Sequence, residues 1–364
     1  MEKVKLKITT LTPVAIGSGE EWSPYADYVL DDNKVYFIDK KKMVERIMAK
    51  GEKLLNDYVY GVASGIDQSM TKSNFDLKNF LLGNQIVKDI KEITSSECRI
   101  EGNPKSKLPI KGMIKSPLGE PYFPGSSIKG ALKTVLMYNW LQANPKAETT
   151  IENVINNGNF NWLEKEFEYK EDNFSGKVIR KNTLQQVTDS NFLLTSDNII
   201  VDCYRAMPIR LECIAKNQTA EFELTLSEYK WTDLAKQANQ YAEDVLNREF
   251  DLIDNQDNLD AYYNFLVDIE DGIIKSPDDT AYFRIGFGKG YYLNSLGIAI
   301  YDYVSQEGKE TLFDKFEDFI NKEYARKDKF GNRIEINLDE FPKTRLFVTS
   351  TQEPLGWIKV ERQQ

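Results

Sequence analysis

The segment FPGSSIKGALKTVL combines a stiff turn, two hydroxyl side chains and two lysines at the start of an apolar helical pattern. Ser126 or Ser127 can cap the helix, and Lys129 and Lys133 lie one turn apart beside its apolar stripe. Free N–H groups, the positive end of the helix dipole and two ammonium groups together can bind phosphate. A capped amphipathic helix with solvated lysines explains the same residues, so both interpretations stay open.

The segment RIGFGKGYY is a second candidate phosphate site. It places Gly286, Gly288 and Gly290 at alternate positions after a predicted strand, and Arg284 and Lys289 add positive charge. Glycines at this spacing let backbone N–H groups meet phosphate oxygens. The spacing fits neither a Walker loop nor a dinucleotide fingerprint, and a tight glycine hairpin without a ligand is the alternative.

The composition restricts the chemistry that these loops can serve. The chain has 364 residues and no histidine, which removes the commonest general acid/base and the commonest transition-metal ligand. The three cysteines are widely spaced, without a CxxC pair, which fits a reducing compartment. No apolar run approaches the length of a membrane span, and the first residues lack the features of a signal peptide. We therefore expect a cytoplasmic protein without a metal or other cofactor.

The net charge of −10 is unevenly distributed. Residues 243–279 contain 12 acidic and 2 basic residues, whereas residues 98–140 contain 7 basic and 2 acidic ones. A basic face over residues 98–140 could neutralise phosphates, with the acidic stretch lying elsewhere. Two ordinary solvated surfaces would give the same composition.

Strand and helix patterns mix along the chain without a regular βαβα order, which indicates an α+β fold. We expect a first strand in KVKLKITTLTPV, a hairpin in DYVLDDNKVYFID, and helices from residue 41 to about residue 100 that are interrupted at GVASG and LLGN. The runs MPIRLECIA and AEFELTLS, joined by KNQT, predict a second hairpin. A helix is expected from residue 127 to about residue 142.

Four segments taken together carry a resemblance to a known family. In chain order they are LTPVAIGSG, YFPGSSIKGALK, FRIGFGKG and FPKTRLFV with PLGWIKV. They resemble the RAMP superfamily of CRISPR effector subunits, most closely the type III-A subunit that caps the guide 3′ end of the backbone filament. The resemblance implies a modified ferredoxin-like (RRM-type) core with helical insertions and a second, degenerate ferredoxin-like half. It divides the chain into residues 1–205, with insertions at about 41–105 and 141–200, and residues 206–364, which hold the glycine-rich loop.

The resemblance also implies a function and a set of contacts. The function is to bind guide RNA, end the filament and support guide maturation in antiviral defence, without catalysis. Partners would be the guide RNA, a neighbouring RAMP backbone subunit and a host nuclease that trims the guide. RNA contacts would fall on Gly17, Ser18 and Gly19, as well as on the residues of the two candidate phosphate sites. Ala15 departs from the pattern, because such subunits often have a histidine there, so a side-chain role at that position is in doubt.

Two other functions stay open. RAMP paralogues that cut target RNA use an aspartate in the loop after the first strand, and Asp27 lies in a comparable place. A magnesium-assisted endonuclease is the alternative function, although a structural hydrogen bond is the more ordinary role for this carboxylate. The third interpretation is an unrelated α+β domain whose glycine loops are only turns.

Overall fold

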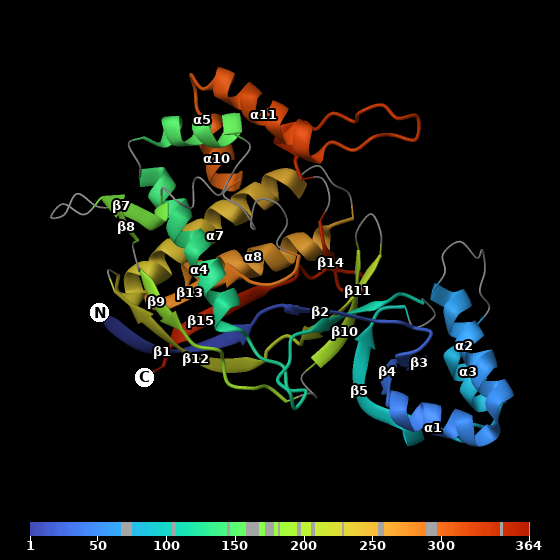
Figure 1. The fold of residues 1–364 in the computed structure, drawn as a ribbon. Coiled ribbons are helices and arrows are strands. Elements are labelled where there is room, and N and C mark those ends of the chain that lie inside the picture. The colour runs from blue at the N-terminus through green and yellow to red at the C-terminus, as the bar shows by residue number, and fades with distance from the viewer. Residues whose placement is uncertain are drawn as a thin grey trace.

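The protein is described here from a computed structural model, which covers residues 1–66, 75–103, 107–143, 146–157, 167–171, 178–180, 183–194, 198–204, 208–227, 229–253, 258–288, 297–342 and 345–363. Two sheets lie side by side, and most of the helices cover one of them, as Figure 1 shows. Among the helices in these ranges, none has the length and apolar composition of a membrane-spanning segment.

The five-stranded sheet is antiparallel throughout and follows from a period-two pattern. Val4, Leu6 and Ile8 of the first strand are buried, while the lysines between them point to solvent. The helices α4 (Gly125–Ala143) and α7 (Trp231–Ile253) pack on the buried face (Figure 1). In spatial order its strands are β13 (Thr280–Arg284), β15 (Trp357–Arg362), β1 (Glu2–Thr10), β12 (Thr219–Leu226) and β9 (Leu184–Val187).

The eight-stranded sheet mixes parallel and antiparallel pairs, and its first strand, β2, lies at its edge. The predicted hairpin at residues 28–38 is confirmed as its other end. The spatial order is β2 (Gly17–Trp22), β6 (Ile110–Met113), β11 (Ile209–Ile214), β10 (Asn198–Tyr204), β5 (Thr94–Glu101), β4 (Lys34–Ile38) and β3 (Tyr28–Asp31), with β14 (Phe347–Val348) paired to β10.

The predicted hairpin between residues 209 and 226 is wrong, because its two strands belong to different sheets. β11 pairs with β10 and β6, whereas β12 pairs with β1 and β9. The chain crosses between the sheets beside Thr10, whose Oγ1 donates to Ala215 O (2.7 Å) and accepts from Gln218 N (2.8 Å). Beyond the crossing, Val14 forms an antiparallel bridge with Ile214. The two sheets are therefore joined by two neighbouring backbone segments.

The helical insertion ends earlier than the predicted boundary at about residue 100, and its helices are divided at different positions from those predicted. Its elements are α1 (Lys40–Lys50), α2 (Glu52–Ile66), α3 (Leu77–Gly83) and the 3-10 helix η1 (Ile90–Ile93), and β5 follows at once. The segment GVASG does not interrupt α2. A Cβ on Gly61 would lie 2.2 Å from the Phe75 ring, and one on Gly65 would lie 2.5 Å from the Tyr25 ring. These glycines allow close packing rather than ending the helix.

The remaining elements lie mostly over the five-stranded sheet (Figure 1). The predicted division at residue 205 stays a prediction, and both sheets combine strands from the two ranges. Residues 243–279 include the second half of α7 and all of α8. The elements are α5 (Ala147–Asn157), β7 (Tyr169–Glu171), β8 (Val178–Arg180), α8 (Asp260–Ile274), α10 (Gly297–Val304), α11 (Glu310–Tyr324) and η3 (Leu338–Glu340).

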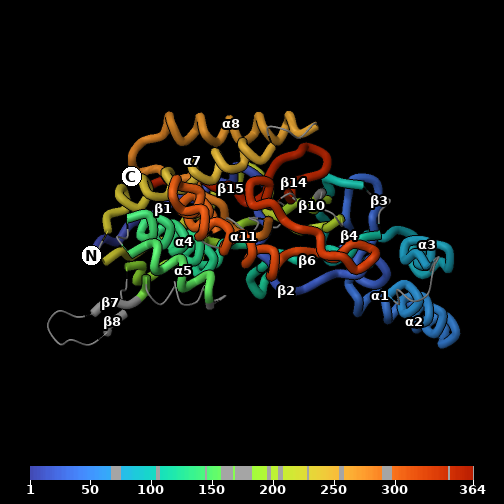
Figure 2. The backbone as a smooth tube through the Cα atoms, turned by 90° about the horizontal axis from the view of Figure 1, so that it is seen from above, coloured from blue at the N-terminus to red at the C-terminus, as the bar shows by residue number. Residues whose placement is uncertain are grey.

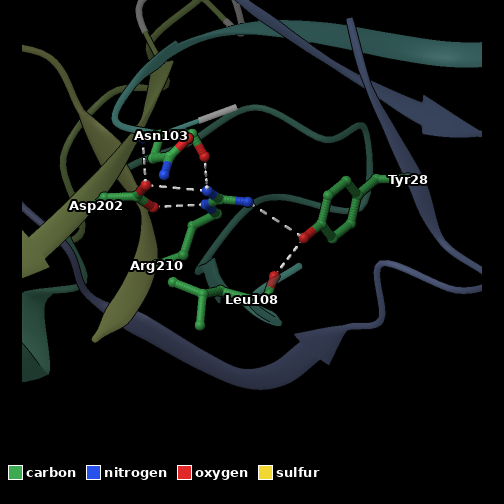
Figure 3. Close-up of polar contacts among 5 residues, drawn as sticks. All are labelled: Tyr28, Asn103, Leu108, Asp202 and Arg210. Carbon is green, nitrogen blue, oxygen red and sulfur yellow. Dashed lines mark hydrogen bonds and ion pairs between the residues drawn. The ribbon is translucent and has the colours of Figure 1, made fainter. Parts of the chain in front are cut away.

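A buried arginine holds the connection that leads into β6. The Arg210 guanidinium is fully buried and donates twice to Asp202, through Nε at 2.6 Å and Nη2 at 2.9 Å (Figure 3). Nη2 also donates to Asn103 O at 2.9 Å, and Nη1 lies 3.4 Å from the Tyr28 hydroxyl, which donates to Leu108 O. Burial opposes the charge of Arg210, but the hydrogen bonds and charge of Asp202 outweigh it and raise the pKa of Arg210. Burial also raises the pKa of Tyr28 to about 12.

Replacing Asp202→Asn tests this network. The change keeps the side-chain size but leaves the buried guanidinium without its counter-charge, which costs about 3 to 5 kcal/mol when one partner of a buried pair is removed. Urea unfolding should therefore show a large loss of stability. Glu97→Gln is the matched control, because its pair with Lys34 is about half exposed and is screened by solvent, so its removal should change stability little. Equal losses in the two variants would contradict the role given to Arg210.

Candidate nucleic-acid interface

Three of the four motif segments meet through backbone hydrogen bonds. Gly356 N donates to Pro13 O (2.9 Å), and Ile285 N donates to Gly356 O (2.8 Å). Phe287 N donates to Ala15 O (2.7 Å). The segment between β1 and β2 thus lies between the glycine loop after β13 and the turn before β15. Segments far apart in the chain thus form one continuous, hydrogen-bonded backbone junction.

Two glycines at this junction are required by contacts inside the protein. Gly286 has φ +76°, and a Cβ there would lie 2.2 Å from Ala15 O. Gly356 has φ +85°, and a Cβ there would lie 2.3 Å from Ile285 O. The side chain of Ala15 is 4% exposed and packs in a core cluster with Leu355, so this position contributes its carbonyl to the junction. These glycines are explained without a ligand.

Arg284 supports the glycine loop from inside the protein. The residue is 7% exposed, and its Nε and Nη2 donate to Leu355 O (3.0 Å) and Gly288 O (3.1 Å). These bonds direct two of the guanidinium donors at the protein's own backbone, and the predicted contact of Arg284 with phosphate stays a prediction. Gly288 itself has φ +91° and lies in the described part of the loop. Lys289 and Gly290 lie outside the described residues.

The Gly17–Gly19 segment forms the start of the edge strand β2 and is exposed. Its register against β6 shifts between Gly17 and Glu21, so the strand is irregular at this point. Ser18 Oγ lies 3.3 Å from Gly112 O and accepts from Glu20 N at 3.1 Å. Gly19 has φ +86°, whereas Gly17 has neither a positive φ nor any atom within 4 Å of an added Cβ. No internal contact in the described ranges explains why residue 17 is a glycine.

The start of α4 differs from the predicted capped helix. The helix begins at Gly125, whose N–H donates to Asp189 Oδ1 (2.7 Å), so the predicted capping role of Ser126 or Ser127 is wrong. Both serines lie in the first turn, where Ser126 is exposed and Ser127 is half-buried. The Asp189 carboxylate therefore already occupies one donor at the positive end of the helix. The predicted apolar stripe of Ile128, Ala131, Leu132 and Val135 is confirmed as buried.

The two predicted lysines of α4 differ in their surroundings. Lys129 is exposed and forms no ion pair with the part of the chain that the structure describes. Lys133 Nζ lies 2.6 Å from Glu168 Oε1, and both side chains are at most one-quarter exposed. Gly130, between them, is exposed, and an added Cβ would meet no atom within 4 Å. The exposed side of α4 near its start thus carries the unpaired Lys129 next to the exposed backbone of Gly130.

The basic stretch 98–140 is largely neutralised inside the protein. Five of its seven basic side chains pair with carboxylates, and Lys105 lies outside the described residues. Lys115 is the most enclosed of them, since its partner Glu212 is fully buried. The five pairs are Arg99–Glu101, Lys107–Asp76, Lys111–Glu21, Lys115–Glu212 and Lys133–Glu168.

Asp27 has a structural position. Its Oδ2 accepts from Ser23 N (2.6 Å), its Oδ1 pairs with Lys40 Nζ (2.6 Å), and its side chain is 12% exposed. Within the described ranges, no group of three or more Cys, Asp or Glu side chains is placed to hold a metal ion. The geometry does not favour a magnesium-assisted role for Asp27.

Comparisons with known proteins bear on these observations. A model of the RAMP superfamily matches residues 7–293. The chain belongs to the RAMP superfamily. The predicted resemblance is therefore confirmed. The chain is 26% identical to the "CRISPR system Cms protein Csm5" of Methanocaldococcus jannaschii, over 98% of this chain and 88% of that protein. It is 34% identical to the Csm5 protein of Streptococcus thermophilus over 36% of this chain and 37% of that protein.

Two solved structures have the same fold. One is a chain in the cryo-EM structure of a Csm–crRNA–target RNA ternary complex of a type III-A CRISPR-Cas system, with TM-score 0.67, 18% identity, and coverage of 98% of this chain and 100% of that one. The other is the crystal structure of T. onnurineus Csm5, with TM-score 0.65, 16% identity, and coverage of 97% and 99%. The predicted α+β class, a modified ferredoxin-like core with helical insertions and a second degenerate half, is confirmed.

Sequence reasoning missed Asp189, the carbonyl of Ala15 and the irregular pairing of β2. Asp189 lies far from α4 in the sequence and has no motif around it. The other two features are properties of the backbone, which no side-chain pattern records.

Glycine-to-alanine substitutions can distinguish glycines that packing inside the protein requires from glycines that an RNA contact would require. Gly286→Ala should lower the melting temperature, because its Cβ would overlap Ala15 O. Gly17→Ala should leave the melting temperature unchanged or slightly higher, since its Cβ meets open space. If RNA approaches the Gly17 backbone closely, the added methyl group should block one hydrogen bond and lower the affinity of the protein for single-stranded RNA about fivefold. Thermal melts and fluorescence anisotropy measure the two effects, and unchanged RNA affinity in Gly17→Ala would contradict the contact.

Proposed function

We propose that this chain is a non-catalytic subunit of a type III-A CRISPR complex that binds guide RNA and ends the backbone filament at the guide 3′ end. The observation that carries the proposal is the relationship to a protein named Csm5 over 98% of the chain. The neighbour with TM-score 0.67 comes from a complex that contains crRNA and target RNA. Guide RNA and a neighbouring RAMP subunit are therefore the proposed partners.

The geometry supports binding through the RNA backbone rather than through bases. The exposed positions at Gly17–Gly19 and on the start of α4 offer N–H groups, a hydroxyl and the charge of Lys129. Such groups meet phosphates and sugars, which carry no sequence information. Guide pairing would then supply specificity, as in other RNA-guided systems. Because Lys129 is the only described cation of residues 98–140 without a carboxylate partner, the salt dependence of binding at this surface should correspond to few phosphate contacts.

Ending a filament requires one adhesive face and one that does not add a further subunit. On this proposal the chain stops assembly, and the guide beyond it is left accessible to a host nuclease that trims it during maturation. The complex would act in the cytoplasm in antiviral defence. The enclosed position of Asp27, held by Ser23 and Lys40, supports the absence of catalysis.

Guide ends report directly on this function. Complexes should be purified through another subunit from cells with and without this chain, and their guides sequenced. We expect guides with shifted or heterogeneous 3′ ends when the chain is missing, and an intermediate result for the double variant Gly17→Ala/Lys129→Ala. Lys53→Ala, an exposed lysine on the distant helix α2, is the matched control.

Two outcomes would contradict the proposal. Identical guide ends with and without the chain would exclude a capping role. Loss of one target cut in an Asp27→Asn complex would show that the subunit is catalytic after all.

A further inference from the structure

A second exposed element stands apart from the candidate interface. Residues Arg326–Ile334, called here the basic hairpin, extend beyond the C-terminal end of α11 (Figure 1). Lys327 and Arg333 form an antiparallel bridge, and Ile334 N donates to Arg326 O (2.8 Å). Neither the predicted interface nor the resemblance in the sequence uses this segment.

The tip of the hairpin is organised by one carboxylate. Asp328 Oδ1 accepts from Phe330 N (2.8 Å) and Asn332 N (2.9 Å), and Gly331 between them has φ +88°. These backbone hydrogen bonds, first that of Asn332, lower the pKa of Asp328. The bonds fix Phe330 at the outer end of the turn.

The base of the hairpin is attached to two helices. The side chain of Asn321, on α11, donates to Ile336 O (3.0 Å) and accepts from Ile336 N (2.8 Å), and its backbone O accepts from Arg333 Nη2 (2.7 Å). The buried Arg248 of α7 donates to Leu338 O (2.7 Å), just beyond the hairpin. The hairpin is thus held at its base and at its turn, while its surface stays open.

The open surface joins an aromatic ring to several cations. Phe330 is 76% exposed and Ile334 is 54% exposed. Arg326, Lys327 and Lys329 are exposed and form no ion pair within the described ranges. Lys329 Nζ lies 5.0 Å from the centre of the Phe330 ring. The carboxylate of Asp328 is turned toward the backbone of the turn, so the outward surface is predominantly positive.

We propose that the basic hairpin binds single-stranded RNA. A base stacks on Phe330, and Arg326, Lys327 and Lys329 contact the flanking phosphates. Stacking on an aromatic ring beside backbone cations is the general means by which proteins hold single strands without sequence preference. The inference rests on the proposed function, because it adds a second RNA contact to a chain proposed to bind guide RNA.

The chemistry favours RNA over a protein partner. The apolar surface at the tip is small, with one ring and one aliphatic side chain, whereas a stable protein interface needs a larger apolar centre. Exposed cations without carboxylate partners can contact the phosphates of a single strand, and the neighbouring Phe330 ring can stack with one of its bases. A protein partner is retained as an outcome of the test below.

The purified full-length chain and a fluorescein-labelled single-stranded RNA of mixed sequence provide the test. Phe330→Ala should weaken binding about tenfold, as expected when one base stack is removed. Tyr60→Ala, with a ring 75% exposed on α2, is the matched control and should have no effect. Lys327→Gln/Lys329→Gln should reduce the slope of log affinity against log salt by roughly 0.7 for each phosphate that is no longer neutralised. Because all these side chains are exposed, melting temperatures should stay unchanged.

The outcomes separate this inference from the proposed function. If Gly17→Ala and Lys129→Ala weaken RNA binding while Phe330→Ala and the lysine variant do not, the hairpin proposal is wrong and the proposed function stands. If the hairpin variants bind RNA normally but no longer join the complex, the hairpin is a protein contact, which also overturns the inference. If the wild-type chain binds no RNA, and complexes lacking it keep the same guide ends, the proposed function itself fails.

Discussion

The candidate interface depends on the contact between the carbonyl of Ala15 and the backbone at Gly286 and Phe287. At this point an added Cβ would lie 2.2 Å from an oxygen atom, so only glycine allows the approach. The contact joins the glycine loop to the segment that continues from the five-stranded sheet into the eight-stranded one. Since Thr10 fixes the neighbouring crossing between the sheets, the two sheets and the loop cannot shift independently. The exposed backbone of β2 is therefore presented from a rigid base.

Several charged side chains of the protein are used internally. Arg210 and Arg284 are buried and direct their guanidinium groups at a carboxylate or at carbonyls. Lys115 and Lys133, in the basic stretch, are paired with enclosed carboxylates. Within residues 98–140, Lys129 is the only described cation without a carboxylate partner, which is why backbone groups carry much of the proposed recognition at this surface. Affinity on this scheme comes from shape and assembly more than from net charge.

Patterns that depend on neighbouring residues could be predicted from the sequence. The alternation in β1, the hairpin at residues 28–38 and the buried stripe of α4 all follow from local periodicity, and they are confirmed. Features that depend on distant partners could not. β11 and β12 follow one another with hairpin spacing, yet each pairs with a strand from another part of the chain. The prediction of a serine cap for α4 was wrong because it also depended on a distant partner. The N–H of Gly125 donates to Asp189, which lies far along the chain.

The candidate site shows the same limit. The motifs identified three segments that do meet in the fold. The motif residues alone could not distinguish a glycine that internal packing requires from a glycine whose added Cβ would meet no other atom. Gly286 and Gly17 look alike in sequence, and only the surroundings of each Cβ separate them. Arg284 likewise has the residue type expected for phosphate, although its hydrogen bonds are directed at the loop itself.

The acidic residues place a further restriction on the proposed path of RNA. The exposed side chains of α8 include Asp268 and Asp271, and Figure 2 shows α8 and β2 toward opposite edges of the molecule. Other carboxylates of the acidic stretch are used in the interior, where Glu249 pairs with Arg345 and Asp244 accepts from the Tyr138 hydroxyl. A phosphate chain near α8 would meet like charges without compensating contacts. Repulsion at that edge and open backbone at the other therefore both favour an RNA path along β2.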